Sequence, residues 1–117
     1  MKAQPFSAQV RQQANLATID LHGEINAFAE SELTEAYSIA EQTNPGTIVL
    51  NFTDVSYINS TGIALIVSLL AQARKSRRRL VVFGLTDHYT EIFKITRLSD
   101  FMTMVPDVAS ALMQAKN

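Results

Sequence analysis

Apolar and polar residues alternate near the start of the chain, which predicts two β-strands. Phe6, Ala8 and Val10 are each followed by a polar residue, which is the two-residue period of a half-buried strand. The largely polar residues 12–15 then separate this segment from a second apolar stretch, 16–23, which ends at a glycine. Because the connection is short, we expect the two strands to pair as an antiparallel hairpin.

Beyond the hairpin, segments with helical spacing alternate with short apolar segments. Ala29, Leu33 and Ala40, for example, recur at helical spacing, while acidic residues take the other face. This alternation predicts an α/β fold in a single domain, residues 1–117, with a mixed, mostly parallel sheet and helices packed against it. The predicted elements are a helix from Asn26 to about Gln42, a strand at 47–52, a loop at 53–59, a helix at 60–76, a strand at 80–84, a helix at 85–96, a strand at 101–105 and a terminal helix that begins at Pro106.

Residues 57–63 join a strand to a helix and form the predicted functional site. Before them lies the β-branched apolar segment 47–52, and after them comes an apolar segment, 63–71, whose length favours a helix. Asn, Ser and Thr within the run are residues that cap helix N-termini, because their side-chain oxygens accept free backbone N–H groups. In an open α/β sheet such a joint lies at the carboxyl edge of a strand, where binding sites form. Gly62 allows close approach, either of a partner or of the helix to the sheet.

The composition excludes several kinds of chemistry. None of the 117 residues is cysteine, so disulfides, thiol catalysis and cysteine-ligated zinc are excluded. Two histidines, His22 and His88, are too few for us to expect a metal site, and we expect no cofactor. No apolar run approaches the roughly 18–20 residues that cross a bilayer. We therefore expect a cytoplasmic protein without direct membrane insertion.

Positive and negative charges are unevenly spread along the chain. Up to Ala73 there are two basic and seven acidic residues, whereas from Arg74 on there are eight basic and four acidic residues. Five of the basic residues lie at positions 74–79. Such a run is either a phosphate- or nucleic-acid-binding patch, or a helix end whose cations face solvent and complement the helix dipole. With no aromatic residues interleaved and a net charge of −1, we favour the helix end and expect no nucleic-acid binding.

The central block of the sequence, residues 48–62, reads IVLNFTDVSYINSTG: an apolar strand, then Asp-x-Ser, an apolar pair, and Asn-Ser-Thr-Gly at the start of a helix. This block resembles the central motif of the STAS domain family, which occurs in bacterial anti-sigma factor antagonists and at the C-terminus of sulphate transporters. Leu98 and Phe101 also resemble part of the family pattern, with Arg97 where the family has glycine. The resemblance runs from 21 to 112 and is nearer to the free-standing antagonist, so it implies a STAS-like fold.

The resemblance implies a protein switch and not an enzyme. In antagonists of this family, the serine before Ser/Thr-Gly is phosphorylated by the anti-sigma factor, which is itself a serine kinase. The unphosphorylated antagonist binds that kinase and frees the sigma factor, and a PP2C-type phosphatase resets the system. By position, Ser60 is the implied phosphoacceptor, with Thr61 in reserve. The residues expected to contact the partner are Asn26, Asp54, Ser56, Asn59, Ser60, Thr61 and Gly62.

Ser60 also suits this role on physical grounds. A hydroxyl at a helix N-terminus lies beside unpaired backbone N–H groups, so a phosphate there would be stabilised by these donors and by the helix dipole. Phosphorylation adds about −1.5 to −2 charges. At the centre of a docking surface this charge must be dehydrated or face like charge, and a loss of roughly 3 kcal/mol weakens binding more than a hundredfold. No change of fold is required.

Two positions depart from the family pattern. The family commonly has aspartate just before the phosphorylated serine and after the first strand, where this chain has Asn59 and Asn26. Asparagine keeps the ability to cap a helix but removes negative charge beside Ser60. Phosphate repulsion therefore falls, while kinase recognition through those carboxylates is lost. The alternative is that Ser60 serves only as an N-cap and that partner binding is constitutive.

Three other functions compete with the switch. Ser60 as a nucleophile would need His22 or His88 as its base, but Gly-x-Ser-x-Gly is absent and neither histidine is in a segment expected to reach Ser60. A nucleic-acid module would depend only on the basic run at 74–79. The most serious alternative keeps the STAS fold but changes its role to the interaction subunit of a phospholipid-transport or sensory complex, without phosphorylation.

Overall fold

A computed structural model describes residues 5–115; the ends of the predicted domain, residues 1–4 and 116–117, lie outside this range. One five-stranded sheet runs through the described residues in the order β1-β2-β3-β4-β5. β1 and β2 pair as the expected antiparallel hairpin, and the remaining neighbours are parallel. The strands are β1 (Ser7–Gln13), β2 (Leu16–Ile25), β3 (Thr47–Ile58), β4 (Arg79–Phe83) and β5 (Thr103–Val105).

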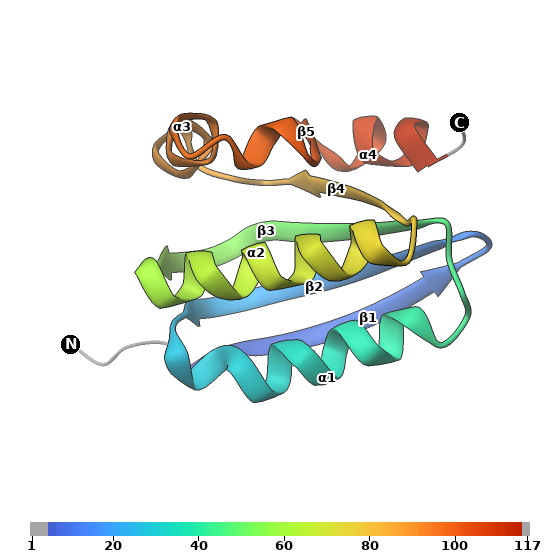
Figure 1. Ribbon diagram of the computed structural model, residues 1–117, viewed down its shortest axis with the longest axis horizontal. Helices are drawn as coiled ribbons and strands as arrows, with labels where there is room; N and C mark the ends of the chain where they lie inside the picture. The colour runs from blue at the N-terminus through green and yellow to red at the C-terminus, as the bar shows by residue number, and fades with distance from the viewer. Residues whose placement is uncertain (1–4, 116–117) are drawn as a thin grey trace.

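α-Helices cover both faces of this sheet, and α1 and α2 lie side by side across one of them (Figure 1). Successive side chains of a strand point to opposite faces. Ile48 and Leu50 of β3 belong to the large core beneath α1, α2 and α3, whereas Val49 belongs to a smaller cluster with Ala111 of α4. α4 therefore packs on the opposite face, and the prediction of an α/β fold is confirmed. The helices are α1 (Glu30–Glu41), α2 (Ser60–Lys75), α3 (Asp87–Ile95) and α4 (Val108–Ala115), with 3₁₀ turns η1 (Ala27–Ala29) and η2 (Leu98–Asp100).

The end of β3 differs from the prediction, because residues 53–58 continue the strand instead of forming a loop. Phe52, Val55 and Ile58 are all buried, and a regular strand with a period of two cannot place residues spaced by three on one face. Two bulges resolve this, since each places an extra residue of β3 against β2. The pairs that bracket the bulges are Asp20 with Asn51, His22 with Asp54, Gly23 with Val55, and Glu24 with Tyr57.

β2 is also longer than predicted and ends at Ile25, not at Gly23. Gly23 borders the second bulge and has a φ of 86°, in the left-handed region that a side chain would make costly. The glycine therefore serves the irregular pairing of β2 with β3 and does not end the strand.

Other element ends shift by a few residues. The segment after Asn26 begins as η1 before it continues as α1, and β5 begins at Thr103. Pro106 was predicted to be the first residue of the last helix, but α4 begins at Val108. The Asp107 carboxylate accepts the N–H of Ser110 at 2.8 Å, so Asp107 caps α4 and Pro106 precedes the cap.

The basic run 74–79 is partly structural. The Arg78 side chain is only 12% exposed, forms an ion pair with Glu41 at 3.3 Å and also donates to the loop that follows α1. It therefore ties the end of α2 to the end of α1, and the expectation that all these cations face solvent is wrong for Arg78. Arg74 lies over the Phe101 ring, 4.8 Å from its centroid.

Candidate functional site

Asn59, and not Ser60, caps α2. The Asn59 side-chain oxygen accepts the N–H of Gly62 at 2.8 Å, and the Asn59 carbonyl accepts the N–H of Ile63 at 2.9 Å. Ser60 is the first residue of α2 and is exposed. The interpretation of Ser60 as only an N-cap is therefore wrong. The first four N–H groups of a helix have no acceptor in a preceding turn. Here Asn59 donates to the Ile25 carbonyl and Gly62 to the Asn59 side chain, so the N–H groups of Ser60 and Thr61 are the other two at this open end.

Gly62 is buried where α2 meets the end of β2. A Cβ at this position would overlap the Ile25 carbonyl oxygen and lie 2.9 Å from the Ile58 side chain. The Asn59 N–H donates to the same Ile25 carbonyl at 3.2 Å. Of the two interpretations of Gly62, the structure shows the close approach of helix to sheet. Gly62 therefore lies beneath the surface formed by its exposed neighbours Ser60 and Thr61.

Asn26 brings the start of α1 to the same place. Its side-chain oxygen accepts the Phe28 N–H at 2.9 Å and so caps η1, while its amide nitrogen lies 3.4 Å from a Glu24 carboxylate oxygen. η1 contacts α2. The segments around Asn26 and Ser60, far apart in sequence, therefore lie side by side at the carboxyl edge of the sheet, the left-hand end in Figure 1.

The predicted contact residues other than Gly62 reach the surface at this edge. Four of them are exposed and the two caps are half-buried. The exposed ones are Asp54, Ser56, Ser60 and Thr61, and the half-buried ones are Asn26 and Asn59.

Two exposed aromatic residues lie at this edge, within the segments 26–30 and 54–59 that the sequence suggests are exposed for docking, although neither was named among the expected contact residues. Phe28 is 94% exposed and Tyr57 is 51% exposed. A signal for Phe28 was present, since it directly precedes the buried Ala29 and falls off the helical stripe of core residues. Tyr57 was expected in an exposed loop but lies on β3, where the bulges decide which side of the strand its side chain occupies.

Tyr89 of α3 holds the last residue of β3. The Tyr89 hydroxyl accepts the Ile58 N–H at 2.9 Å and donates to the Ile58 carbonyl at 3.4 Å. β4 pairs with β3 only as far as Asn51, so the end of β3 has no strand on that side. The side chain of Tyr89 thus replaces a neighbouring strand immediately before Asn59 and Ser60. Sequence alone gives no sign of this contact.

The charged side chains of the segments that lead to Ser60 are acidic, apart from His22. No lysine or arginine occurs between positions 21 and 73. Asn26 and Asn59, which flank Ser60, are neutral, whereas Glu30 begins α1 and Asp54 is exposed on β3. Asp54 also lies 3.4 Å from the Nδ1 atom of His22. The centre of the surface is therefore uncharged and its border is acidic.

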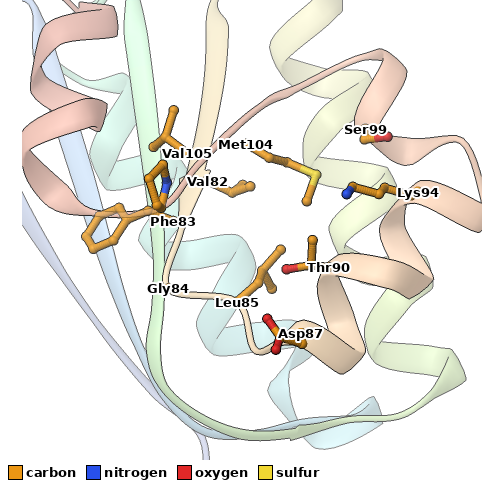
Figure 2. A pocket seen from close by; sticks show the side chains of 11 residues that line it. Val82, Phe83, Gly84, Leu85, Asp87, Thr90, Lys94, Ser99, Met104 and Val105 are labelled. Carbon is orange, nitrogen blue, oxygen red and sulfur yellow. The ribbon is translucent and has the colours of Figure 1, made fainter.

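A hollow of about 610 Å³ lies farther along the same edge, between β4, β5 and α3. Figure 2 shows Asp87, Thr90 and Lys94 of α3 on one side of it, with Leu85 and Met104 near its middle. Asp87 and Lys94 are seven residues apart, roughly 10 Å along a helix, so these opposite charges do not converge on one point. Among residues 5–115, no three His, Asp or Glu side chains are placed to hold a metal ion.

Comparisons with known proteins identify the family. The family model described as "STAS domain" matches residues 7–111. An anti-sigma-B factor antagonist from Listeria monocytogenes is 34% identical over 80 residues, 68% of this chain and 70% of the relative. A second relative with this name, from Staphylococcus aureus, is 31% identical over 72% of this chain and 78% of its own length.

Solved structures share the fold at low sequence identity. An anti-sigma factor antagonist from Mycobacterium paratuberculosis superposes with a TM-score of 0.83 at 16% identity, over 97% of this chain and 96% of that one. The Bacillus cell fate determinant SpoIIAA in its phosphorylated form superposes with a TM-score of 0.71 at 20% identity, over 92% of this chain and 98% of that one. Across the described part of the chain, no helix is long and apolar enough to span a membrane. The family match and the fold together show that the chain belongs to the STAS domain family.

Proposed function

We propose that this protein is an anti-sigma factor antagonist, a protein-binding switch without catalytic activity of its own. In its unphosphorylated form it binds an anti-sigma factor serine kinase through the surface around Ser60 and thereby releases the sigma factor. Phosphorylation of Ser60 blocks binding, and a PP2C-type phosphatase restores it. The names of the relatives that are more than 30% identical to the chain support this role, as does a solved structure of similar fold in a phosphorylated form.

One observation carries the proposal: Ser60 is exposed at the start of α2, and the fold does not use its hydroxyl as the cap. A kinase can therefore modify this hydroxyl without breaking a contact that begins the helix. The added phosphate would lie beside the N–H groups of Ser60 and Thr61 and the positive end of the helix dipole. We expect the domain to stay folded when it is phosphorylated.

The same geometry supports a way in which a phosphate would prevent docking. The centre of the surface, formed by Asn26, Asn59, Ser60 and Thr61, carries no charge. A partner that packs on this centre accepts a neutral hydroxyl but has to dehydrate a dianion. A penalty of roughly 3 kcal/mol lowers the affinity more than a hundredfold.

Two substitutions at Ser60 test the switch. Ser60→Ala should bind the purified anti-sigma factor kinase of the same bacterium as tightly as the wild type, even after incubation with ATP. Ser60→Asp should bind at least tenfold more weakly, because it places a permanent charge at the centre of the surface. Isothermal titration calorimetry measures both affinities, and mass spectrometry should find the kinase-dependent phosphate on Ser60. Ser68→Ala, an exposed serine farther along α2, is the control.

Equal affinities of Ser60→Ala and Ser60→Asp for the kinase would contradict the switch. Phosphate found on Thr61 of the wild type, and not on Ser60, would show that Thr61 is the phosphoacceptor. A wild-type chain that does not bind the kinase at all would reject the proposed partner.

A second candidate function is favoured by Asn26 and Asn59, which stand where the resemblance leads us to expect aspartate. In this alternative the domain is a constitutive interaction subunit of a lipid-transport or sensory complex. Tight binding of a transporter or sensor subunit that is equal for Ser60→Ala and Ser60→Asp, with no phosphate on Ser60 in cells, would support it.

A further inference from the structure

Phe28 has no role in the fold that explains its presence. It is 94% exposed, whereas the next residue, Ala29, is fully buried. Its backbone N–H bonds to the Asn26 cap, but this contact needs no aromatic side chain. Leaving a phenylalanine in water forgoes the stabilisation that burial would give. An exposed aromatic of this kind is the type of residue that carries binding energy at protein interfaces.

Phe28 borders the neutral centre around Ser60. η1, which contains Phe28, contacts α2. Tyr57, half exposed on β3, stands on the same edge and pairs across the sheet with Glu24 of β2. Two exposed aromatics, a neutral centre and an acidic border reproduce the usual anatomy of an interface, with an uncharged core inside a polar rim.

We propose that Phe28 is the anchor of the docking surface and that it inserts into an apolar pocket of the anti-sigma factor kinase bordered by lysine or arginine side chains. The chemistry of the partner follows from charge complementarity, because this half of the chain has no lysine or arginine between positions 21 and 73 and displays Glu30 and Asp54 around the centre. This inference rests on the proposed function and names the partner pocket for that same site.

A basic border on the partner is compatible with a switch driven by phosphate. Its cations face the acidic rim, and a phosphate on Ser60 lies inside that rim, in the part of the interface that packs against apolar atoms. The rim therefore controls the rate of association and its salt dependence, while the anchor controls how long the complex lasts.

Phe28→Ala tests the anchor directly. We expect this variant to bind the purified kinase roughly 30-fold more weakly or worse, the equivalent of about 2 kcal/mol, chiefly through faster dissociation in surface plasmon resonance. Its urea unfolding midpoint should equal that of the wild type, because the side chain buries almost nothing. A structural role would lower the midpoint instead.

Phe101→Ala is the matched control. Phe101 is an exposed phenylalanine too, at 50%, but it lies beneath Arg74 at the far end of α2. Arg74 is 14 residues, or roughly 20 Å, along the helix from Ser60. The affinity of Phe101→Ala for the kinase should equal that of the wild type. Raising the salt concentration should slow association of both the wild type and Phe28→Ala, because the acidic rim is intact in each.

The possible outcomes separate this inference from the proposed function. A wild type that binds the kinase together with an unchanged affinity of Phe28→Ala would overturn the anchor and leave the switch standing. A wild type that does not bind the kinase would overturn both. A concentration-dependent dimer of the free chain that Phe28→Ala abolishes would show that a second copy, and not the kinase, covers Phe28.

Discussion

Asn59 and Gly62 together determine how α2 begins, Asn59 through its side chain and Gly62 because it has none. The Asn59 side chain accepts the Gly62 N–H, and the missing Cβ of Gly62 lets the helix lie against the Ile25 carbonyl. Ser60, between them in sequence, has no part in either contact, so its side chain is available for the phosphorylation proposed above. The role proposed for Ser60 thus depends on Asn59, which caps α2, and on Gly62, which lets the helix approach the sheet.

Gly62→Ala should destabilise the fold even though alanine favours a helix more than glycine does. The new methyl group would overlap the Ile25 carbonyl and push α2 away from the sheet, at a cost of about 1–3 kcal/mol. Urea unfolding measures the change in the free energy of unfolding. Ser68→Ala, on the exposed side of the same helix, should stay within about 0.5 kcal/mol of the wild type. A Gly62→Ala variant more stable than the wild type would show that this contact is not tight.

Single residues were predictable where local chemistry decides their role. Asn26 and Asn59 were expected to cap helices; Asn59 caps α2, and Asn26 caps η1, the turn that leads into α1, since capping depends on a few neighbouring atoms. Arg97 was recognised only as a replacement for glycine, and the structure gives it a φ of 67°, the left-handed conformation that glycine adopts freely. The contact of Tyr89 with Ile58 could not be foreseen, because it depends on how two distant segments meet.

At the scale of elements, α3 supplies the hydrogen bonds that β4 is too short to give to the end of β3. β3 extends beyond β4, and the Tyr89 hydroxyl bonds both polar backbone groups of Ile58 in place of a strand. Buried backbone groups without partners are costly, so this contact keeps the end of β3 in the sheet. The start of α2 follows immediately and is fixed by the same contact.

Tyr89→Phe should therefore loosen the strand end that leads into the site. Loss of the hydroxyl leaves the Ile58 N–H and carbonyl unpaired and should lower the free energy of unfolding by about 1–3 kcal/mol. Hydrogen exchange should become faster at the Ile58 amide. Tyr57→Phe serves as the control, because the Tyr57 side chain is half exposed. Unchanged exchange at Ile58 in Tyr89→Phe would show that water replaces the hydroxyl without loss.

The order of the elements was predictable, but the length of β3 was not. Apolar runs and turn residues mark where strands and helices alternate, and the observed order agrees with the predicted one. The bulges changed the spacing of buried residues from two to three between Phe52 and Ile58, which is why this stretch resembled a loop. Bulges depend on the pairing of two strands, and the sequence of one strand does not reveal them.

Over the whole molecule, one face of the sheet is covered by helices and the other only in part. On the second face, Asp20 of β2 accepts hydrogen bonds from the Arg11 side chain at 2.6 and 3.0 Å and from Asn51 at 2.8 Å. Partial burial acts to raise the pKa of Asp20, but these hydrogen bonds and the charge of Arg11 outweigh it, so the pKa is lowered. Three adjacent strands are thereby joined by one carboxylate.

This carboxylate should make the fold sensitive to acid. Because the pKa of Asp20 is lower in the folded protein, its contribution to stability is present above about pH 4 and is lost as the pH falls through the folded pKa. Asp20→Asn should lower stability at neutral pH and flatten its decline between about pH 5 and pH 2, as followed by thermal unfolding. Glu91→Gln, at an exposed site on α3, tests the general effect of removing a negative charge. An acid profile of Asp20→Asn that is parallel to that of the wild type would contradict this assignment.

Loss or gain of one residue between Phe52 and Ile58 would turn the following side chains to the opposite side of β3. Ile58 would leave the core, and α2 would begin from a rotated starting point with Ser60 aimed elsewhere. Substitutions at the outward positions Asp54 and Ser56 leave that geometry untouched. Relatives that recognise different partners through this edge should therefore differ in the identity of these side chains and keep the number of residues constant.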